Sequence, residues 1–173
     1  ASRQIFKFSR LKSVKTADES VRWIPFAIVP EKPSNDSISK NKSVKKTKPE
    51  VENLILFNLK TADTILVSSV TEYHYSKKGT HIYYNIQLND SISVTSTLYR
   101  FNTVSRDREM VFSDRGTLKK VVSDDSGGKY AFLFSKDTVD NKVFSLFFRT
   151  TLNPPEKIID GYTPGIPIGW SPS

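Results

Sequence analysis

Few side chains in this sequence could do metal or acid–base chemistry. The two histidines, His74 and His81, stand on either side of a Lys77-Lys78-Gly79 turn. Cross-strand pairing around that turn would bring the two imidazoles near one another, and Glu72 would supply a carboxylate for a metal. No signature spacing supports such a site, so we expect both histidines to be structural. We therefore predict no metal and no other cofactor.

The remaining motifs do not complete a catalytic site either. Asp124, Asp125 and Ser126 offer oxygen ligands, but they lack the alternating spacing of a calcium-binding loop. Gly127-Gly128 lacks the helix that follows a phosphate-binding loop. The sequence contains no cysteine, which excludes thiol nucleophiles, disulfides and iron–sulfur clusters. We predict a protein that is not an enzyme, although a site built from scattered residues remains an alternative.

Positive charge is concentrated at the start of the chain. The formal net charge is +8, and residues 1–48 hold 12 Lys and Arg against 4 Asp and Glu, while the remaining residues are balanced. This asymmetry predicts contact with an anionic partner, either nucleic acid or an acidic membrane surface. The residues that we predict to make this contact are Lys7, Arg10, Lys12, Lys15, Lys40, Lys42, Lys45, Lys46 and Lys48.

Two simpler interpretations of these charges stay open. The first basic residues alternate with apolar ones, as in an edge strand with a solvated face. Residues 30–50 are rich in Lys, Pro and Ser, which predicts a long flexible loop. A loop of this length inside a compact domain is usually functional, but a solubilising linker fits the composition equally well.

The stretch from Ile65 to Phe101 predicts three antiparallel strands joined by two tight turns. In the middle strand, side chains alternate between a core face and a wetter face. Such a meander is stable only if its apolar face meets a second layer. The core face comprises Ile82, Tyr84, Ile86 and Leu88, and the wetter face comprises His81, Tyr83, Asn85 and Gln87.

The rest of the chain also reads as strands. Pro25 interrupts an apolar run over 21–29 and predicts an edge or bulge position, whereas 130–134 and 143–152 predict a central hairpin. Only 156–160 indicates a short helix. The expected fold is all-β, an antiparallel sandwich or jelly-roll-like domain of about eight to ten strands with little helix. We expect one domain, with basic strands over 1–29, the loop over 30–50, a β core over 51–153 and a proline-rich tail over 154–173.

Aromatic side chains on the meander are candidates for contact with a partner. Tyr73, Tyr75 and Tyr83 stand beside basic residues, an arrangement that can stack single-stranded bases. Packing against a second sheet or a subunit is the more common role of such residues. In the tail, Trp170 is a candidate for docking onto a neighbouring molecule.

As a small, cysteine-free, strand-rich chain with a lysine-rich front, a start at Ala1-Ser2 and a proline-rich end, the sequence resembles small basic structural proteins of viruses. The resemblance is to two kinds of viral protein, namely coat proteins and the matrix proteins of plant rhabdoviruses. The Pro-Pro-x-Tyr budding motif of matrix proteins is absent, because Pro154-Pro155-Glu156 is followed by Lys157. The resemblance implies self-association, contact with nucleic acid, nucleocapsid or anionic membrane, no catalysis, and location in the host cytoplasm and the virion.

Two functions are therefore expected. The first is a non-enzymatic, self-assembling matrix or capsid protein whose basic front third binds the anionic partner. The alternative is a monomeric module that binds single-stranded nucleic acid or serves in movement or transport. No apolar run is long enough for a membrane span and no signal peptide is evident, so we expect a soluble intracellular protein.

Overall fold

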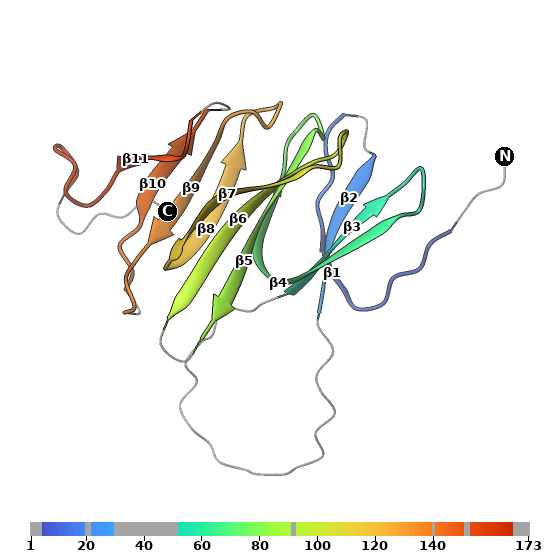
Figure 1. Ribbon diagram of the computed structural model, residues 1–173, viewed down its shortest axis with the longest axis horizontal. Coiled ribbons are helices and arrows are strands. Elements are labelled where there is room, and N and C mark those ends of the chain that lie inside the picture. Colours follow the sequence, from blue (N-terminus) through green and yellow to red (C-terminus); the bar gives the residue numbers. More distant parts are fainter. Residues whose placement is uncertain are drawn as a thin grey trace, which may run out of the picture.

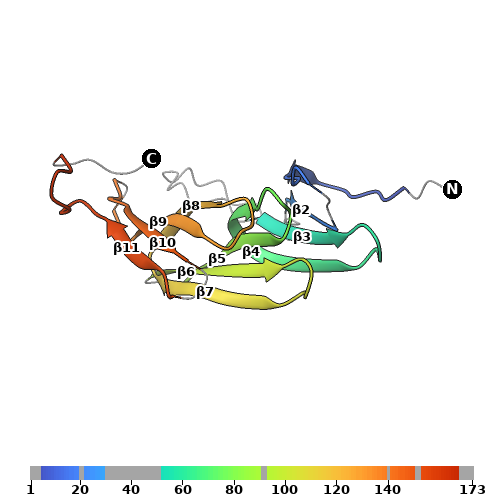
Figure 2. The ribbon, with the colours of Figure 1, turned by 90° about the horizontal axis from the view of Figure 1, so that it is seen from above.

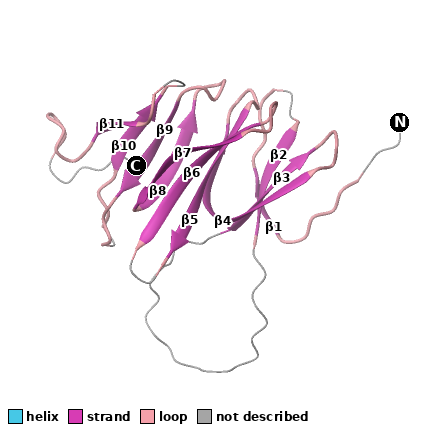
Figure 3. Cartoon of the chain, viewed as in Figure 1, coloured by secondary structure: helices cyan, strands magenta, loops and turns pink. Residues whose placement is uncertain are grey.

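All regular structure in the described chain is β-strand (Figure 3). The structure is a computed structural model that describes residues 5–19, 22–29, 52–90, 93–139, 141–150 and 153–167. Within these ranges no helix is long and apolar enough to cross a membrane. The strands are β1 (Leu11–Val14), β2 (Trp23–Ile28), β3 (Glu52–Asn58), β4 (Thr64–Tyr75), β5 (His81–Asn89), β6 (Val94–Asn102), β7 (Arg108–Arg115), β8 (Thr117–Ser123), β9 (Tyr130–Ser135), β10 (Ser145–Arg149) and β11 (Glu156–Ile159).

The strands form two antiparallel sheets in which chain neighbours are also sheet neighbours (Figure 1). One sheet has seven strands in the order β1 to β7, and the other has four, from β8 to β11. The predicted all-β antiparallel class is confirmed. A jelly roll is built from Greek keys, which place non-consecutive strands side by side. The described strands instead follow one another as a meander.

The seven-stranded sheet bends at β4, which belongs to two pairings. Its first part, from Thr64 to Val67, pairs with β3, its last part, from Glu72 to Tyr75, pairs with β5, and Val70 pairs with both. Between them Ser69 has a positive φ of 62°, typical of a bulge that turns a strand. The strands therefore form three groups, which we call the first layer (β1–β3), the second layer (β4–β7) and the third layer (β8–β11) (Figure 1).

A separate apolar core fills each space between layers. The Trp23 ring on β2 lies 5.2 Å from the Phe101 ring on β6, although three strands separate β2 from β6 in the sheet order. A contact between two strands so far apart in the sheet order shows that the first layer folds over the second. On the opposite side, Tyr83 of the second layer packs against Tyr130 of the third at 4.8 Å. Figure 2 shows the third layer lying along one face of the second.

The polar face predicted for β5 is buried, contrary to expectation. The exposed fraction is 0% for Tyr83, 0% for Asn85 and 3% for Gln87, because the third layer covers this face of the strand. The Asn85 Nδ2 atom donates a 2.8 Å hydrogen bond to the Thr71 hydroxyl. A strand with alternating polarity is thus covered on both sides, and side-chain hydrogen bonds compensate part of the cost of burying its amides.

One glycine connects the two sheets. β7 ends at Arg115 and β8 begins at Thr117, so the chain leaves one sheet and enters the other across Gly116 alone. The φ of Gly116 is 145°, a region that favours glycine. Its N–H donates to the Val94 carbonyl at 2.7 Å, and its carbonyl accepts a 2.8 Å bond from the Ser96 hydroxyl.

Two local predictions need correction and one is confirmed. Glu156–Ile159 is strand β11 and not a helix, since it pairs with β10. Pro25 lies on a strand with neighbours on both sides. The β9–β10 hairpin is confirmed, and the whole of the 30–50 loop lies outside the described residues.

The position of Pro25 has a simple backbone explanation. Pairing between β1 and β2 ends at Val14 and Phe26, and the Pro25 carbonyl then accepts a 3.3 Å bond from the Lys15 N–H. The N–H and C=O of one strand residue point to the same neighbour. The N–H that proline lacks would therefore face Lys15, one residue beyond the end of β1, and not β3, which pairs with β2 over its whole length.

Candidate ligand-binding pocket

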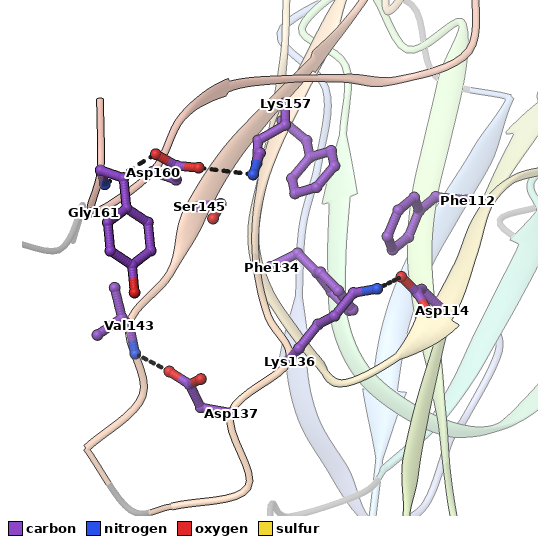
Figure 4. Close-up of a pocket in the computed structure, with 12 residues that line it drawn as sticks. Phe112, Asp114, Phe134, Lys136, Asp137, Val143, Ser145, Lys157, Asp160 and Gly161 are labelled. Carbon is purple, nitrogen blue, oxygen red and sulfur yellow. Dashed lines mark hydrogen bonds and ion pairs between the residues drawn. The ribbon is translucent and has the colours of Figure 1, made fainter. Parts of the chain in front are cut away.

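A pocket of about 750 Å³ opens between the second and third layers (Figure 4). Its floor consists of three phenylalanine rings, Phe112 from β7, Phe134 from β9 and Phe147 from β10. The Phe112 ring centroid lies 4.9 Å from that of Phe134 and 5.5 Å from that of Phe147. The floor is therefore a continuous aromatic surface held by three different strands.

Strand periodicity places these rings on one side. In the third layer, Phe132 and Phe134 of β9 and Phe147 of β10 alternate with residues that face away from the second layer. Their common face is the one that packs on β7. Phe112 and Phe147 are only partly buried, whereas Phe134 is 2% exposed, so the rings of Phe112 and Phe147 offer the accessible part of this surface.

Five charged side chains form the rim, and four of them neutralise one another in two ion pairs. The Lys136 ammonium lies 2.8 Å from the Asp114 carboxylate, and the Lys157 ammonium lies 2.7 Å from the Asp160 carboxylate (Figure 4). These lysine hydrogen bonds lower the pKa of both carboxyl groups below their usual range. Because two ion pairs neutralise four of the five charged lining residues, the pocket favours an apolar ligand group over an ion.

Backbone contacts shape the loop beside the pocket. The Asp137 carboxylate accepts a 2.7 Å hydrogen bond from the Val143 N–H. The Lys142 ammonium donates to the Asp137 and Val139 carbonyls at 3.0 and 2.9 Å. Among the lining residues, Ser145 and Tyr162 carry the hydroxyl groups and none is a histidine. A lining of this kind, aromatic with a few polar groups at its edge, can bind a ligand.

A half-buried ion cluster joins the layers beside Tyr130. The Glu109 carboxylate lies 2.5 Å from Arg100 of its own sheet and 3.0 Å from Arg149 of the third layer. Arg149 also donates to the Tyr130 hydroxyl at 3.1 Å. Burial acts to raise the pKa of Glu109, but the hydrogen bonds from both arginines outweigh it, so the pKa is lowered. The cluster links the second and third layers through one carboxylate shared by two arginines, so its net charge is +1.

The two histidines do not form a metal site. His74 pairs across the ladder with Tyr83, and His81 pairs with Asn102, so the two are not opposite each other. His74 Nε2 lies 3.0 Å from the Ser123 hydroxyl, and His81 Nδ1 lies 3.0 Å from the Ser126 carbonyl. Within the described ranges no three His, Cys, Asp or Glu residues are grouped to hold a metal ion.

Both histidines should make the fold less stable in mild acid. Burial lowers the pKa of His74 and of His81 below 6.5, so the unfolded chain binds these protons more tightly than the folded chain. The free energy of unfolding should fall as the pH drops from roughly 7 to 5. Denaturant unfolding over this range should show a smaller decrease when His74→Gln and His81→Gln are combined. An unchanged decrease would assign it to other groups.

Two of the predicted basic contacts serve the fold itself. The Lys12 ammonium lies 2.6 Å from the Glu52 carboxylate. Lys15 donates to the Tyr73 carbonyl and stands 4.5 Å above the Tyr73 ring. Lys7 and Arg10 are exposed. The other predicted contacts, namely Lys40, Lys42, Lys45, Lys46 and Lys48, lie outside the described residues, as does Trp170.

The candidate stacking tyrosines are core residues. The exposed fraction is 6% for Tyr73, 6% for Tyr75 and 0% for Tyr83. Tyr75 donates to the Trp23 carbonyl at 2.7 Å, and burial raises the pKa of Tyr75 to about 12. These rings present no open face to a base, so packing against neighbouring layers is the role that the structure gives them.

Comparison with known proteins shows a fold likeness only. No protein-family model matches the chain, and no curated protein matches it significantly. Among solved structures, the β-propeller domain of the Trilobed protease from Pyrococcus furiosus is similar over 89% of this chain and 42% of its own, with 13% identity and a TM-score of 0.57. The acylaminoacyl peptidase of Pyrococcus horikoshii is similar over 88% of this chain and 25% of its own, with 9% identity and a TM-score of 0.59.

A further similar structure is an acylaminoacyl peptidase in complex with Z-Gly-Gly-Phe-chloromethyl ketone, which is 8% identical with a TM-score of 0.57. This chain covers 24% of that protein. The chain thus spans less than half the length of each of these proteins. The three layers correspond to part of a β-propeller, a fold in which small meander sheets are arranged around an axis. The resemblance to viral structural proteins stays a prediction, since none of these matches bears on it.

Sequence reasoning missed the pocket. Phe134 and Phe147 fall in apolar runs that predict central strands, and nothing in those runs distinguishes a ring at the margin from one at the centre. The one usable signal was Phe112, an aromatic residue followed closely by the charged Asp114 on the same strand face. That pattern indicates a place where a buried face ends.

Proposed function

We propose that this protein is a non-enzymatic, propeller-type binding module whose pocket holds an apolar or aromatic side chain of a polypeptide. The observation that carries the proposal is the floor of Phe112, Phe134 and Phe147 beneath a rim on which two ion pairs neutralise four of the five charged side chains. Concave, mainly apolar sites of 300 to roughly 1,000 Å³ are typical ligand sites. The lining offers apolar affinity and no catalytic pair.

An unpaired strand edge beside the pocket makes a polypeptide a better ligand than an isolated small molecule. β7, which supplies Phe112, is the last strand in the order of its sheet, so one backbone edge of β7 is unpaired among the described strands. An extended segment can add to such an edge while its alternate side chains enter a pocket. The similar solved proteins are named as a protease or as peptidases, and a peptide ligand for this chain is consistent with those names.

Filling the pocket should weaken peptide binding without unfolding the protein. Ser145 lines the pocket from β10 and is partly exposed, so Ser145→Trp places a large ring into open space. We expect it to weaken binding of acetyl-Gly-Leu-Phe-Leu-Gly-amide at least tenfold, equivalent to ~1.4 kcal/mol. Isothermal titration calorimetry measures the change.

The matched control is Val122→Trp, which adds the same ring to β8 at a side chain that is 54% exposed and does not line the pocket. It should bind like the unmodified protein. A peptide of glycine and serine should not bind to any of the three proteins. Equal binding by the Ser145→Trp protein would show that the peptide binds elsewhere.

Self-association is the second candidate function, and the exposed start of the chain favours it. All four residues of the edge strand β1 are exposed, and so are the apolar residues Ile5, Phe6 and Phe8 before it. Exposed edges and apolar segments are common contact points between copies. The basic residues Lys7 and Arg10 lie on the same stretch, and contact with nucleic acid or an anionic membrane remains part of this second proposal.

A further inference from the structure

Residues 5–8 form a short arm that lies on the outer face of the first layer. Phe6 packs against Phe57 of β3 with ring centroids 4.7 Å apart. Phe8 packs against Phe26 of β2 at 4.5 Å and against Phe57 at 5.2 Å. Lys7, between the two rings, is exposed. The arm thus alternates as an extended segment does, with both rings directed to the sheet.

The receiving face is a second apolar surface on β2 and β3. Trp23 and Leu56 point from these strands into the core between layers, whereas Phe26, Ile55 and Phe57 point the opposite way. Their exposed fractions are 4%, 9% and 5%, and the described side chains in ring contact with them are those of the arm. This face therefore has an aromatic-x-aromatic segment as its ligand.

The arm is lightly attached. Ile5 is 72% exposed, Phe6 39% and Phe8 38%, so roughly a third or more of each side chain stays in water. The chain then bends at Arg10, a non-glycine residue with a positive φ of 59°, a conformation that costs about 1–2 kcal/mol. The Arg10 carbonyl accepts a 3.1 Å bond from the Val29 N–H, which fixes the start of β1. Arg10 therefore lies between strand β1, which is fixed by backbone hydrogen bonds, and the arm, which is held by side-chain packing. We take Arg10 as the hinge at which the arm can detach.

We propose that two copies of this protein exchange their arms, so that Phe6 and Phe8 of one copy occupy the Phe26–Phe57 face of the other. The occupant is a second copy because the chain itself carries the complementary segment, and exchange recreates the same ring contacts. Four residues span at most about 14 Å, so the two faces must lie opposite one another. The result is a two-fold, isologous dimer. This inference rests on the self-association proposed above and is independent of the pocket.

The test compares three proteins by light scattering over a range of concentrations. The unmodified protein should shift from monomer to dimer as its concentration rises. Phe6→Ser combined with Phe8→Ser should stay monomeric, whereas the control Lys7→Ser, which alters the exposed arm residue, should dimerise as before. The peptide acetyl-Gln-Ile-Phe-Lys-Phe-Ser-Arg-amide, which copies residues 4–10, should bind to the double variant and shift the ring resonances of Phe26 and Phe57.

The outcomes distinguish self-association in general from arm exchange in particular. A dimer that persists in the double variant would keep self-association and overturn arm exchange. An unmodified protein that is monomeric throughout would overturn both. A monomeric double variant that does not bind the arm peptide would show that the substitutions act in some other way, which also overturns arm exchange. The double variant is checked for folding by its near-ultraviolet circular dichroism.

Discussion

Gly116→Ala should destabilise the protein by at least about 3 kcal/mol, because it combines strain at a special φ with overpacking. A Cβ atom at this position would lie 2.2 Å from the Ser135 carbonyl oxygen and 2.6 Å from Cζ of Phe134. The first of these atoms belongs to the backbone of β9 and cannot move without disturbing the sheet. The second is on the ring that forms the pocket floor. Strain in the backbone and displacement of Phe134 should therefore occur together.

Gly165→Ala is the matched control for this prediction. Gly165 also has a positive φ, of 88°, but a Cβ atom there would meet nothing within 4 Å. It should cost only the conformational penalty, on the order of 1 kcal/mol. Urea unfolding followed by circular dichroism measures both values. If the two variants lost equal stability, the result would contradict the close contact between Gly116 and the backbone of β9.

Tyr83→Ala should cost about 3–5 kcal/mol, the range for removing a fully buried aromatic side chain. Tyr83 has no exposed surface and packs 4.8 Å from Tyr130 of the third layer. Its hydroxyl donates a 2.5 Å hydrogen bond to the Gly127 carbonyl. Tyr83→Phe keeps the ring and removes only this bond, so it should cost about 1–2 kcal/mol because the carbonyl loses its donor.

Tyr162→Ala provides the comparison for an exposed ring, since this side chain is 96% exposed. Its effect on stability should stay within about 0.5 kcal/mol. Guanidinium unfolding ranks the three variants. A stable Tyr83→Ala protein with weakened binding of single-stranded RNA would instead support the base-stacking role that we predicted from the sequence.

The strands of the meander were predictable because their periodicity is strong. Ile82, Tyr84 and Ile86 alternate with polar residues, and β5 pairs with β4 and β6 as expected. The burial of Asn85 and Gln87 was not predictable, since a polar face indicates solvent unless something distant covers it. That cover is the third layer, which begins at residue 117.

The arrangement of the layers could not be predicted from local sequence patterns, for a related reason. A sandwich, a jelly roll and a propeller segment share the same alternating strands and differ in where the chain turns from one sheet to the next. Here those turns depend on a bulge at Ser69 and a single glycine at Gly116. Gly116 sits in a Ser-Asp-Arg-Gly stretch that reads as an ordinary turn, so its role as the link between sheets is a tertiary property.

The same limit applies to the candidate site. The lining of the pocket comes from β7, β9, β10 and β11 and from the loops beside them, and no local motif joins these segments. Basic and aromatic residues near the start were easier to single out, but Lys12 and Lys15 make contacts within the fold. Charge composition alone did not distinguish a side chain that binds a partner from one that ties down an edge strand.

The most direct test of the proposed function is a peptide titration observed at the pocket floor. Acetyl-Gly-Leu-Phe-Leu-Gly-amide is added to protein labelled on its phenylalanine rings, and ring resonances are followed by nuclear magnetic resonance. We predict saturable shifts confined to Phe112, Phe134 and Phe147, with Phe6, Phe8 and Phe26 unchanged. Shifts at the arm without shifts at the pocket floor, or no shifts at any ring, would contradict the assignment of this pocket as a peptide site.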